Sequence, residues 1–236
     1  MMSDPLMIVC GADTRYVRPL GVMLRSVVAN LSPNRKATVY ILDAGIEPKH
    51  KAEVTATWDP ELVTAHWIPT EDGAFDGVPL WGRMPVTTYY KLRIADMLPP
   101  AVRRAIWLDC DLVVVSDLAR LWDTDCGDHH VMAVQDSIVP LVSSPFGVTH
   151  YTQLGIPATA KYFNAGVMAA VGRSVEGLAR AVVLHLIAPE VAPDAIEVQV
   201  DAPNRKLAAS ALKVKLDPTT SLVAQQPILR SCRLTL

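Results

Sequence analysis

Short apolar runs alternate along the chain with stretches in which apolar residues recur every three or four positions. The first such pair is Leu6–Cys10, typical of a buried strand, followed by Arg18–Asn30, which has helical spacing. The same pattern predicts strands at 38–42, 62–68, 104–108, 112–115, 131–135 and 162–170, and helices at 47–58, 87–97, 118–122 and 175–187. Strands that alternate with helices form a mostly parallel sheet covered by helices, so an α/β fold is predicted.

Two stretches of the chain depart from this alternation. Residues 70–85 are rich in glycine and proline, and irregular stretches of this length in a compact domain are usually functional or mobile loops. Residues 178–236 contain no glycine and no aromatic residue, although the whole chain has 12 glycines. We therefore expect one domain over residues 1–187 and a divergent or truncated C-terminal region over residues 188–236.

Composition and charge exclude several classes of protein. Half of the 236 residues are hydrophobic and 19% are charged, so the chain can bury a sizeable core and is not disordered. With 22 basic and 24 acidic residues the net charge is −2, which lacks the basic excess of a nucleic-acid-binding protein. The four cysteines form no C-x-x-C pair, so neither a zinc site nor a disulfide framework is indicated.

The sequence favours a cytoplasmic location. No apolar run approaches the roughly 18 residues that span a bilayer. Asp4 and Asp13 flank the apolar stretch Leu6–Cys10, which is unlike a secretory signal. Because the C-terminal region lacks aromatic residues, we expect membrane contact to be at most peripheral, at the inner face of the membrane.

Two aspartates, Asp109 and Asp111, directly follow the apolar strand predicted at 104–108. Open α/β sheets bind ligands at the carboxyl ends of strands, and paired carboxylates there suit a hard cation such as Mg²⁺ or Mn²⁺. A D-x-D pair also arises by chance in loops, but two carboxylates beside an apolar strand are costly without a cation. The sequence therefore predicts a metal site at this strand end.

The same motif supports a second interpretation. An apolar strand followed by D-x-D-x-V, here Asp109–Val113, also opens phosphatases whose first aspartate attacks phosphorus. Those enzymes begin with the motif, whereas residues 1–108 precede it here, and no later acidic pair with a partner lysine is evident. An aspartate-nucleophile phosphatase is therefore the less favoured hypothesis.

Six segments resemble, in order and spacing, glycosyltransferase family 8, the retaining nucleotide-sugar transferases that include bacterial lipooligosaccharide galactosyltransferases and glycogenin. They are IVCGADTRY at 8–16, LDAGI at 42–46, TTYYKL at 87–92, WLDCDLVV at 107–114, LWDTD at 121–125 with Gly127-Asp128, and YFNAGV at 162–167. The resemblance covers about residues 6–187. It implies a fold of the glycosyltransferase A type, a single domain with a Rossmann-like mixed sheet flanked by helices.

The resemblance also implies an activity. A hexose, galactose or glucose, would pass from a UDP-sugar to an acceptor hydroxyl with retention of configuration, as in the synthesis of bacterial cell-surface glycans such as lipopolysaccharide. The acceptor would be a glycan or a lipid-linked sugar. Mn²⁺ or Mg²⁺, held by Asp109 and Asp111, would stabilise the departing nucleotide. Because no carboxylate nucleophile is evident, a front-face reaction assisted by the leaving phosphate is favoured.

Donor-binding residues follow from the same resemblance. Ala12, Asp13 and Thr14 would contact the uracil and ribose, while Tyr16 would stack on the base or else only pack at the start of a helix. Lys91 would lie near the sugar and phosphates, or else face solvent on an amphipathic helix. Further nucleotide-sugar contacts would come from Asp109, Cys110, Ala165 and Gly166.

Three residues match catalytic positions of the family. Asp136 and Asn164 would line the pocket for the donor sugar and the acceptor, where Asn164 would bind a sugar hydroxyl or else cap nearby backbone. The family's later Asp-Gln-Asp segment has only Asp201-Ala202-Pro203 as its counterpart, so Asp201 is the third candidate. Asp43, in the turn-like sequence Asp-Ala-Gly, is expected to be structural.

The closing motif of the family, whose histidine is a third metal ligand, has no counterpart in the sequence, where the last histidine is His185. A divergent or truncated enzyme explains this, and so does a coding sequence whose 3′ part has shifted in frame. Either explanation leaves a wetter and weaker metal site. A catalytically degenerate UDP-sugar-binding protein is therefore the alternative function.

Overall fold

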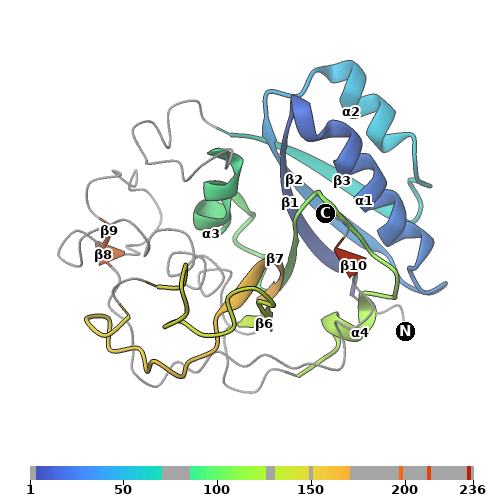
Figure 1. The fold of residues 1–236 in the computed structure, drawn as a ribbon. Coiled ribbons are helices and arrows are strands. Elements are labelled where there is room, and N and C mark those ends of the chain that lie inside the picture. The colour runs from blue at the N-terminus through green and yellow to red at the C-terminus, as the bar shows by residue number, and fades with distance from the viewer. Residues whose placement is uncertain are drawn as a thin grey trace.

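The computed structural model describes residues 4–70, 86–125, 131–148 and 151–170, together with three two-residue strands further along the chain (Figure 1). In chain order the elements are β1 (Leu6–Asp13), the 3₁₀ helix η1 (Thr14–Tyr16), α1 (Val17–Ala29), β2 (Ala37–Ala44), α2 (Pro48–Thr55), β3 (Val63–Pro69), the 3₁₀ helix η2 (Val86–Arg93), α3 (Ile94–Met97), β4 (Ala105–Leu108), β5 (Leu112–Val113), α4 (Ala119–Trp122), β6 (Val131–Gln135), β7 (Phe163–Ala170), β8 (Glu197–Val198), β9 (Leu212–Lys213) and β10 (Arg233–Leu234).

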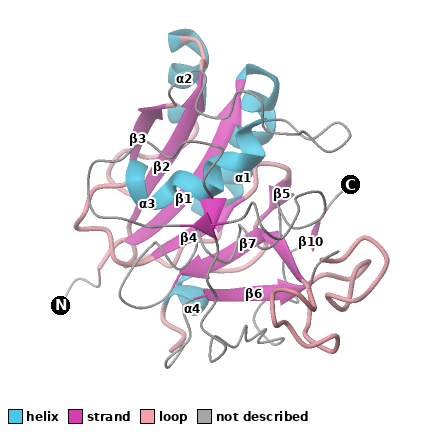
Figure 2. Ribbon diagram, turned by 90° about the vertical axis from the view of Figure 1, so that its left-hand side faces the viewer, coloured by secondary structure: helices cyan, strands magenta, loops and turns pink. Residues whose placement is uncertain are grey.

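A six-stranded sheet forms the centre of the fold, with strand order β3-β2-β1-β4-β7-β6 (Figure 2). β1, β2, β3 and β4 are parallel, whereas β7 runs antiparallel to both of its neighbours, β4 and β6. Outside this sheet, β5 pairs with β10 and β8 pairs with β9. The mixed sheet flanked by helices confirms the predicted α/β fold, and β7 is the strand that makes it mixed.

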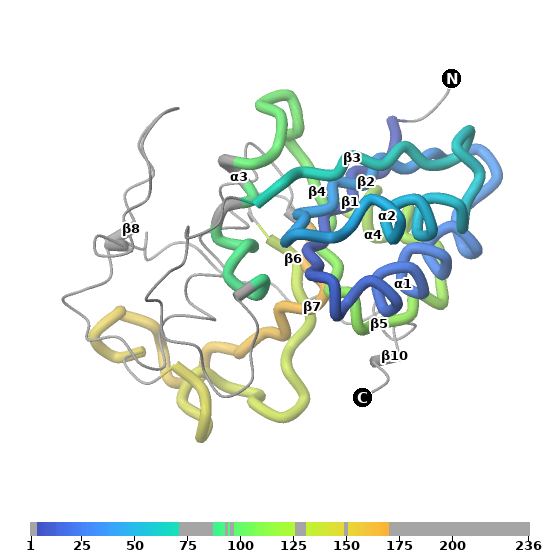
Figure 3. Tube along the Cα trace, turned by 90° about the horizontal axis from the view of Figure 1, so that it is seen from above, coloured from blue at the N-terminus to red at the C-terminus, as the bar shows by residue number. Residues whose placement is uncertain are grey.

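The two faces of the sheet carry separate hydrophobic clusters, because successive strand residues point to opposite sides. In β4, Ile106 and Leu108 belong to the cluster beneath α1 and α2, whereas Ala105 and Trp107 belong to the cluster beneath η2 and α3. Figure 3 shows α1 and α2 on one side of the strands and α3 on the other. Both faces of the sheet are therefore buried, which explains why the sequences of its strands are continuous apolar runs.

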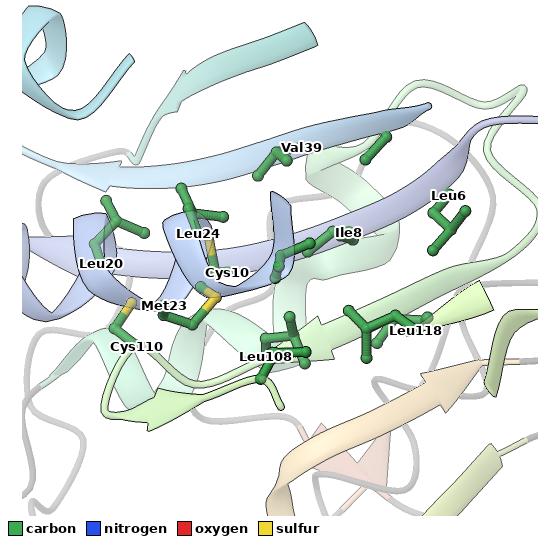
Figure 4. Packing of buried hydrophobic residues seen from close by; sticks show 14 of the residues in the cluster. Leu6, Ile8, Cys10, Leu20, Met23, Leu24, Val39, Leu108, Cys110 and Leu118 are labelled. Carbon is green, nitrogen blue, oxygen red and sulfur yellow. The ribbon is translucent and has the colours of Figure 1, made fainter. Parts of the chain in front are cut away.

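Helix α1 covers the first face with a regular apolar stripe. Leu20, Met23 and Leu24 are at most 1% exposed and point toward Ile8 and Cys10 of β1 (Figure 4). Full burial of one such side chain stabilises the fold by roughly 1.5–3 kcal/mol. Among the described residues, none of the helices has the length and apolar character that spanning a bilayer requires.

The helix predicted at 87–97 differs from the structure. Residues 86–93 form the 3₁₀ helix η2, and only the last turn, α3, is α-helical. Its run of threonines and tyrosines has low α-helix propensity. Thr87, Tyr89, Tyr90 and Lys91 are all buried, so these four residues do not form the solvent-exposed face of an amphipathic helix. The helix predicted at 175–187 lies outside the described residues.

Two glycines offer a test of the fold. Gly45 has φ of +83° after β2, and a Cβ there would meet no atom within 4 Å, so only backbone strain opposes Gly45→Ala. We expect this variant to lower the free energy of unfolding by about 1–2 kcal/mol. Gly21 lies within α1, where a Cβ would make an ordinary contact with Val54 at 3.8 Å. Gly21→Ala should raise the free energy of unfolding by about 0.5–1 kcal/mol. Urea denaturation measures both, and shifts of the same sign would contradict the structure.

Candidate functional site

Polar side chains gather at one edge of the central sheet. Asp13 ends β1, and Asp109 and Asp136 directly follow the parallel strands β4 and β6. Because β7 runs in the opposite direction, its first residues, including Asn164, lie at this same edge. Open α/β sheets bind their ligands where the carboxyl ends of strands meet. The structure therefore brings the predicted site residues Asp109, Asp136 and Asn164 to one place.

A buried lysine and a tryptophan hold the Asp109 carboxylate. Lys91 Nζ lies 2.8 Å from Asp109 Oδ1, and Trp107 Nε1 donates a hydrogen bond of 2.7 Å to the same oxygen. Lys91 Nζ also donates to the backbone oxygen of Ala165 at 3.1 Å and lies 5.1 Å from the centre of the Trp107 ring. The ammonium group is thus shared between an anion, a carbonyl dipole and an aromatic face.

The burial of Lys91 excludes one of the two positions predicted for its side chain. Its side chain is only 4% exposed, so the solvent-facing position on an amphipathic helix is wrong. A buried ammonium without a partner would cost several kcal/mol, which makes the pairing with Asp109 obligatory. Contact between Lys91 and a phosphate or sugar stays a prediction, and the ion pair means that such a contact would share the ammonium group with Asp109.

An irregularity in β7 shapes this side of the site. The register between β6 and β7 shifts between Ala133 and Val134, so residues 165–167 of β7 fall within a bulge. On the other side of β7, Val167 keeps its pairing with Leu108 of β4, and Asp109 N donates to Gly166 O at 2.8 Å. Bulges commonly re-aim backbone and side-chain groups beside functional sites. Here the bulge presents the Ala165 carbonyl to Lys91.

Asn164 uses its side-chain amide within the protein. Its Nδ2 donates to Asp136 Oδ2 at 3.1 Å, and its Oδ1 accepts from Gly166 N at 2.9 Å. Asp136 Oδ1 in turn accepts from the backbone N–H groups of Ile138 and Val139, both at 2.8 Å. Of the two roles considered for Asn164, the capping of nearby backbone is observed. A contact with a sugar hydroxyl stays a prediction.

Two further protonatable groups beside the site stay neutral. The hydrogen bond with Cys10 and burial raise the pKa of the Cys110 thiol well above its usual range, and Cys110 Sγ donates to Gly11 O at 3.2 Å. Burial and the nearby Asp136 raise the pKa of Tyr162 to about 12. Neither group supplies an anion at neutral pH. The Cys110 side chain is buried and its thiol is engaged with Gly11 O, so the predicted contact of Cys110 with a nucleotide, which stays a prediction, would use its backbone.

The first strand is longer than predicted. Ala12 and Asp13 are its last residues rather than part of the following loop, and Ala12 is only 1% exposed. Asp13 Oδ1 accepts from the backbone N–H groups of Arg15 and Tyr16, while its Oδ2 pairs with the Arg15 guanidinium at 2.7 Å. Both carboxylate oxygens are therefore already engaged, and a contact of Asp13 with the uracil or ribose, which stays a prediction, would share them. Any contact of Ala12 with a nucleotide would have to use its backbone.

The two other residues predicted to bind the nucleotide lie in η1. Thr14 is exposed, and its Oγ1 donates to Gly45 O at 3.2 Å, which joins the ends of β1 and β2. Tyr16 is half-buried and packs against the core beneath α1. The packing role considered for Tyr16 is thus present. Stacking of Tyr16 on a base stays a prediction that uses the exposed part of its ring.

The donor set suits a hard cation with few protein ligands. No group of three metal-ligating side chains occurs within the described part of the chain. Asp111 is exposed, and among described residues no hydrogen bond reaches Oδ2 of Asp109. Two open carboxylates fit Mg²⁺ or Mn²⁺, which retain water and phosphate ligands. Asp201 lies outside the described residues, so its predicted catalytic role stays a prediction.

Sequence reasoning missed Trp107 as part of the site. Residues two apart on a strand share a face, so Trp107 and Asp109 could have been paired from their spacing. The Arg15 contact with Asp13 carried no comparable signal. The expectation for Asp43 is confirmed, because Asp43 is 4% exposed, accepts from Ile46 N at 2.7 Å and forms an ion pair with Lys51.

Comparisons with known proteins agree on one family. The model of Glycosyl transferase family 8 matches residues 7–171. General stress protein A of Bacillus subtilis (strain 168) is 29% identical over 170 residues, which are 71% of this chain and 57% of that protein. A crystal structure of galactosyltransferase LgtC in complex with donor and acceptor sugar analogs is 30% identical, with a TM-score of 0.62 over 74% of this chain and 60% of that one.

A more distant structure shares the fold. The apo structure of the bifunctional glycosyltransferase WbbM is 20% identical, with a TM-score of 0.58 over 76% of this chain and 34% of that one. The chain therefore spans 57–60% of the length of the two more similar proteins and about a third of this one.

The ion pair between Lys91 and Asp109 can be tested by stability. Asp109→Asn leaves a buried ammonium without its anion, so we expect the free energy of unfolding to fall by about 2–4 kcal/mol. The double variant with Lys91→Met should recover most of that loss, because methionine needs no counter-charge. Urea denaturation in the presence of a chelator measures both.

Asp111→Asn is the matched control, since its exposed carboxylate should change stability by less than about 0.5 kcal/mol. Additive effects of the two changes at positions 91 and 109 would contradict the pairing.

Proposed function

The chain belongs to glycosyl transferase family 8 and has a fold of the glycosyltransferase A type, and from this premise we propose that it is a metal-dependent hexosyltransferase. It transfers galactose or glucose from a UDP-sugar to an acceptor hydroxyl with retention of configuration. The acceptor is a glycan or a lipid-linked sugar of the bacterial cell surface, and the reaction takes place in the cytoplasm. Family membership also leaves no support for the phosphatase interpretation.

One observation carries this proposal: at a strand end, Asp109 is held through Oδ1, no hydrogen bond from the described segments reaches its Oδ2, and the exposed Asp111 follows two residues later. Enzymes of this family generally use a divalent metal ion. Asp109 and Asp111 would hold Mn²⁺ or Mg²⁺, which supplies Lewis-acid stabilisation of the charge on the departing nucleoside diphosphate.

The chain's own residues bind and orient the donor. At the end of β1, the uridine is offered hydrogen bonds by the backbone of Ala12 and by Asp13 and Thr14, and a stacking surface by the exposed part of Tyr16. Lys91 adds positive charge near the phosphates. Ala165 and Gly166 present backbone beside Asp109, where the absence of a side chain on Gly166 leaves room for the donor sugar.

Retention of configuration by a front-face route fits the engagement of the site carboxylates. Asp136 accepts three hydrogen bonds, two from the backbone N–H groups of Ile138 and Val139 and one from Asn164, so it holds its own loop and Asn164 in place. Asp109 is paired with Lys91 and Trp107 through Oδ1, and its other oxygen is the one assigned to the cation. Neither is a poised nucleophile for a double displacement, so the leaving phosphate is the group that assists deprotonation of the acceptor.

The division of the chain is part of the proposal. Residues 1–187 form the nucleotide-sugar transferase domain, and residues 188–236 form a divergent or truncated C-terminal region that contributes Asp201. The family match at 7–171 supports the first part of this division. The alternative is a degenerate UDP-sugar-binding protein, which would bind the donor without turning it over.

Titration calorimetry of UDP with and without Mn²⁺ tests the donor site. We expect a dissociation constant in the micromolar range with Mn²⁺, about −8 kcal/mol, and binding at least about tenfold weaker without it. Asp111→Asn should reduce the metal-dependent affinity by about tenfold or more, because an open ligand is lost. Glu61→Gln, an exposed change at the opposite edge of the sheet, should bind as the wild type does. Binding that is indifferent to Mn²⁺ would refute the metal site.

Turnover separates the transferase from the degenerate binding protein. With UDP-galactose or UDP-glucose and a panel of glycan acceptors, we expect a product with the anomeric configuration of the donor, read from its proton NMR coupling. Asn164→Ala frees Gly166 N and Asp136 from their partner, so kcat should fall by roughly 10–100-fold. An inverted product would refute the proposed mechanism, and binding without any product would favour the degenerate protein.

A further inference from the structure

We propose that Trp107 is a positioning residue of the metal site, which fixes the Asp109 carboxylate so that Oδ2 is the oxygen offered to the cation. This inference rests on the proposed function. Its starting point is that two donors, Trp107 Nε1 at 2.7 Å and Lys91 Nζ at 2.8 Å, converge on Oδ1 alone. Oδ1 is thereby engaged by both donors, whereas no donor in the part of the chain that the structure describes reaches Oδ2.

The tryptophan is itself closely packed. It is 2% exposed, and its ring end lies 3.4 Å from the position that a Cβ on Gly11 would occupy. Its other partner, the Lys91 ammonium, lies 5.1 Å from the ring centre. A locked indole fixes the direction of its N–H, so Asp109 is held in one orientation before any ligand arrives. Such preorganisation of a metal ligand by an outer hydrogen bond raises metal affinity.

The space on the other side of the carboxylate is kept open by a glycine. A Cβ on Gly166 would lie 3.3 Å from Asp109 Oδ2 and 2.9 Å from Asn164 Oδ1. Trp107 therefore closes one side of Asp109 with a donor, while Gly166 leaves the opposite side accessible. The combination selects which oxygen can act as a ligand, a role distinct from filling the core.

The test replaces the indole N–H without changing the shape of the ring. Benzothienylalanine carries sulfur in place of N–H, and it can be introduced at position 107 by stop-codon suppression. We expect metal-dependent UDP affinity, measured by calorimetry, to fall about 10–100-fold. UDP affinity in chelator should stay unchanged, and the urea midpoint should fall only modestly, because a single hydrogen bond to the partly exposed Asp109 is lost. The same replacement at the buried Trp58, in the other cluster, is the control and should alter none of these quantities.

A role in packing alone would leave Mn²⁺-dependent affinity unchanged when only the N–H is lost, so unchanged or tighter binding overturns the inference. Gly166→Ala gives a second test, because its Cβ would crowd Oδ2 while the indole bond persists, and affinity should again fall at least about tenfold. Wild-type affinity in Gly166→Ala overturns the assignment of Oδ2. If the wild type itself shows no Mn²⁺-dependent binding, the proposed function fails and takes this inference with it.

Discussion

The burial of one positive charge constrains the rest of the site. Lys91 places an ammonium group between the sheet and η2, where it would destabilise the fold by several kcal/mol without compensation. Asp109, the Ala165 carbonyl and the Trp107 ring supply that compensation from three directions. Because the buried Lys91 ammonium must be paired, Asp109 is already oriented in the folded protein before any ligand binds.

The direction of a single strand makes this compensation possible. β7 runs against its neighbours, so its first residues, rather than its last, lie where β4 ends. A parallel strand in that place would bring its own carboxyl end to the edge. The bulge at 165–167 then frees the Ala165 carbonyl from the ladder with β6 while the pairing with β4 continues. The direction of β7 and its bulge together bring the Ala165 carbonyl to the Lys91 ammonium.

The sequence predicts the framework better than the contacts. Apolar runs mark the strands because both faces of the sheet are buried, and the position of Asp109 after such a run locates the site. Helical periodicity, by contrast, does not distinguish a solvent-facing lysine from one that is buried against a partner distant in sequence. The burial of Lys91 thus depends on Asp109 and Ala165, which local spacing does not reveal. For residues 86–93, the low α-helix propensity of the threonines and tyrosines was a local signal against an α-helix, but periodicity alone did not reveal the 3₁₀ form.

The two aspartates of the D-x-D motif play unequal parts. Asp109 is anchored by two donors, whereas Asp111 is exposed and free to adjust. A rigid ligand reduces the entropy lost on binding, and a mobile one accommodates the coordination that the cation prefers. Two carboxylates alone hold Mg²⁺ or Mn²⁺ weakly, because these ions retain most of their water. On the proposed function, the diphosphate supplies the missing ligands, so cation and nucleotide strengthen each other's binding and an idle enzyme holds neither tightly.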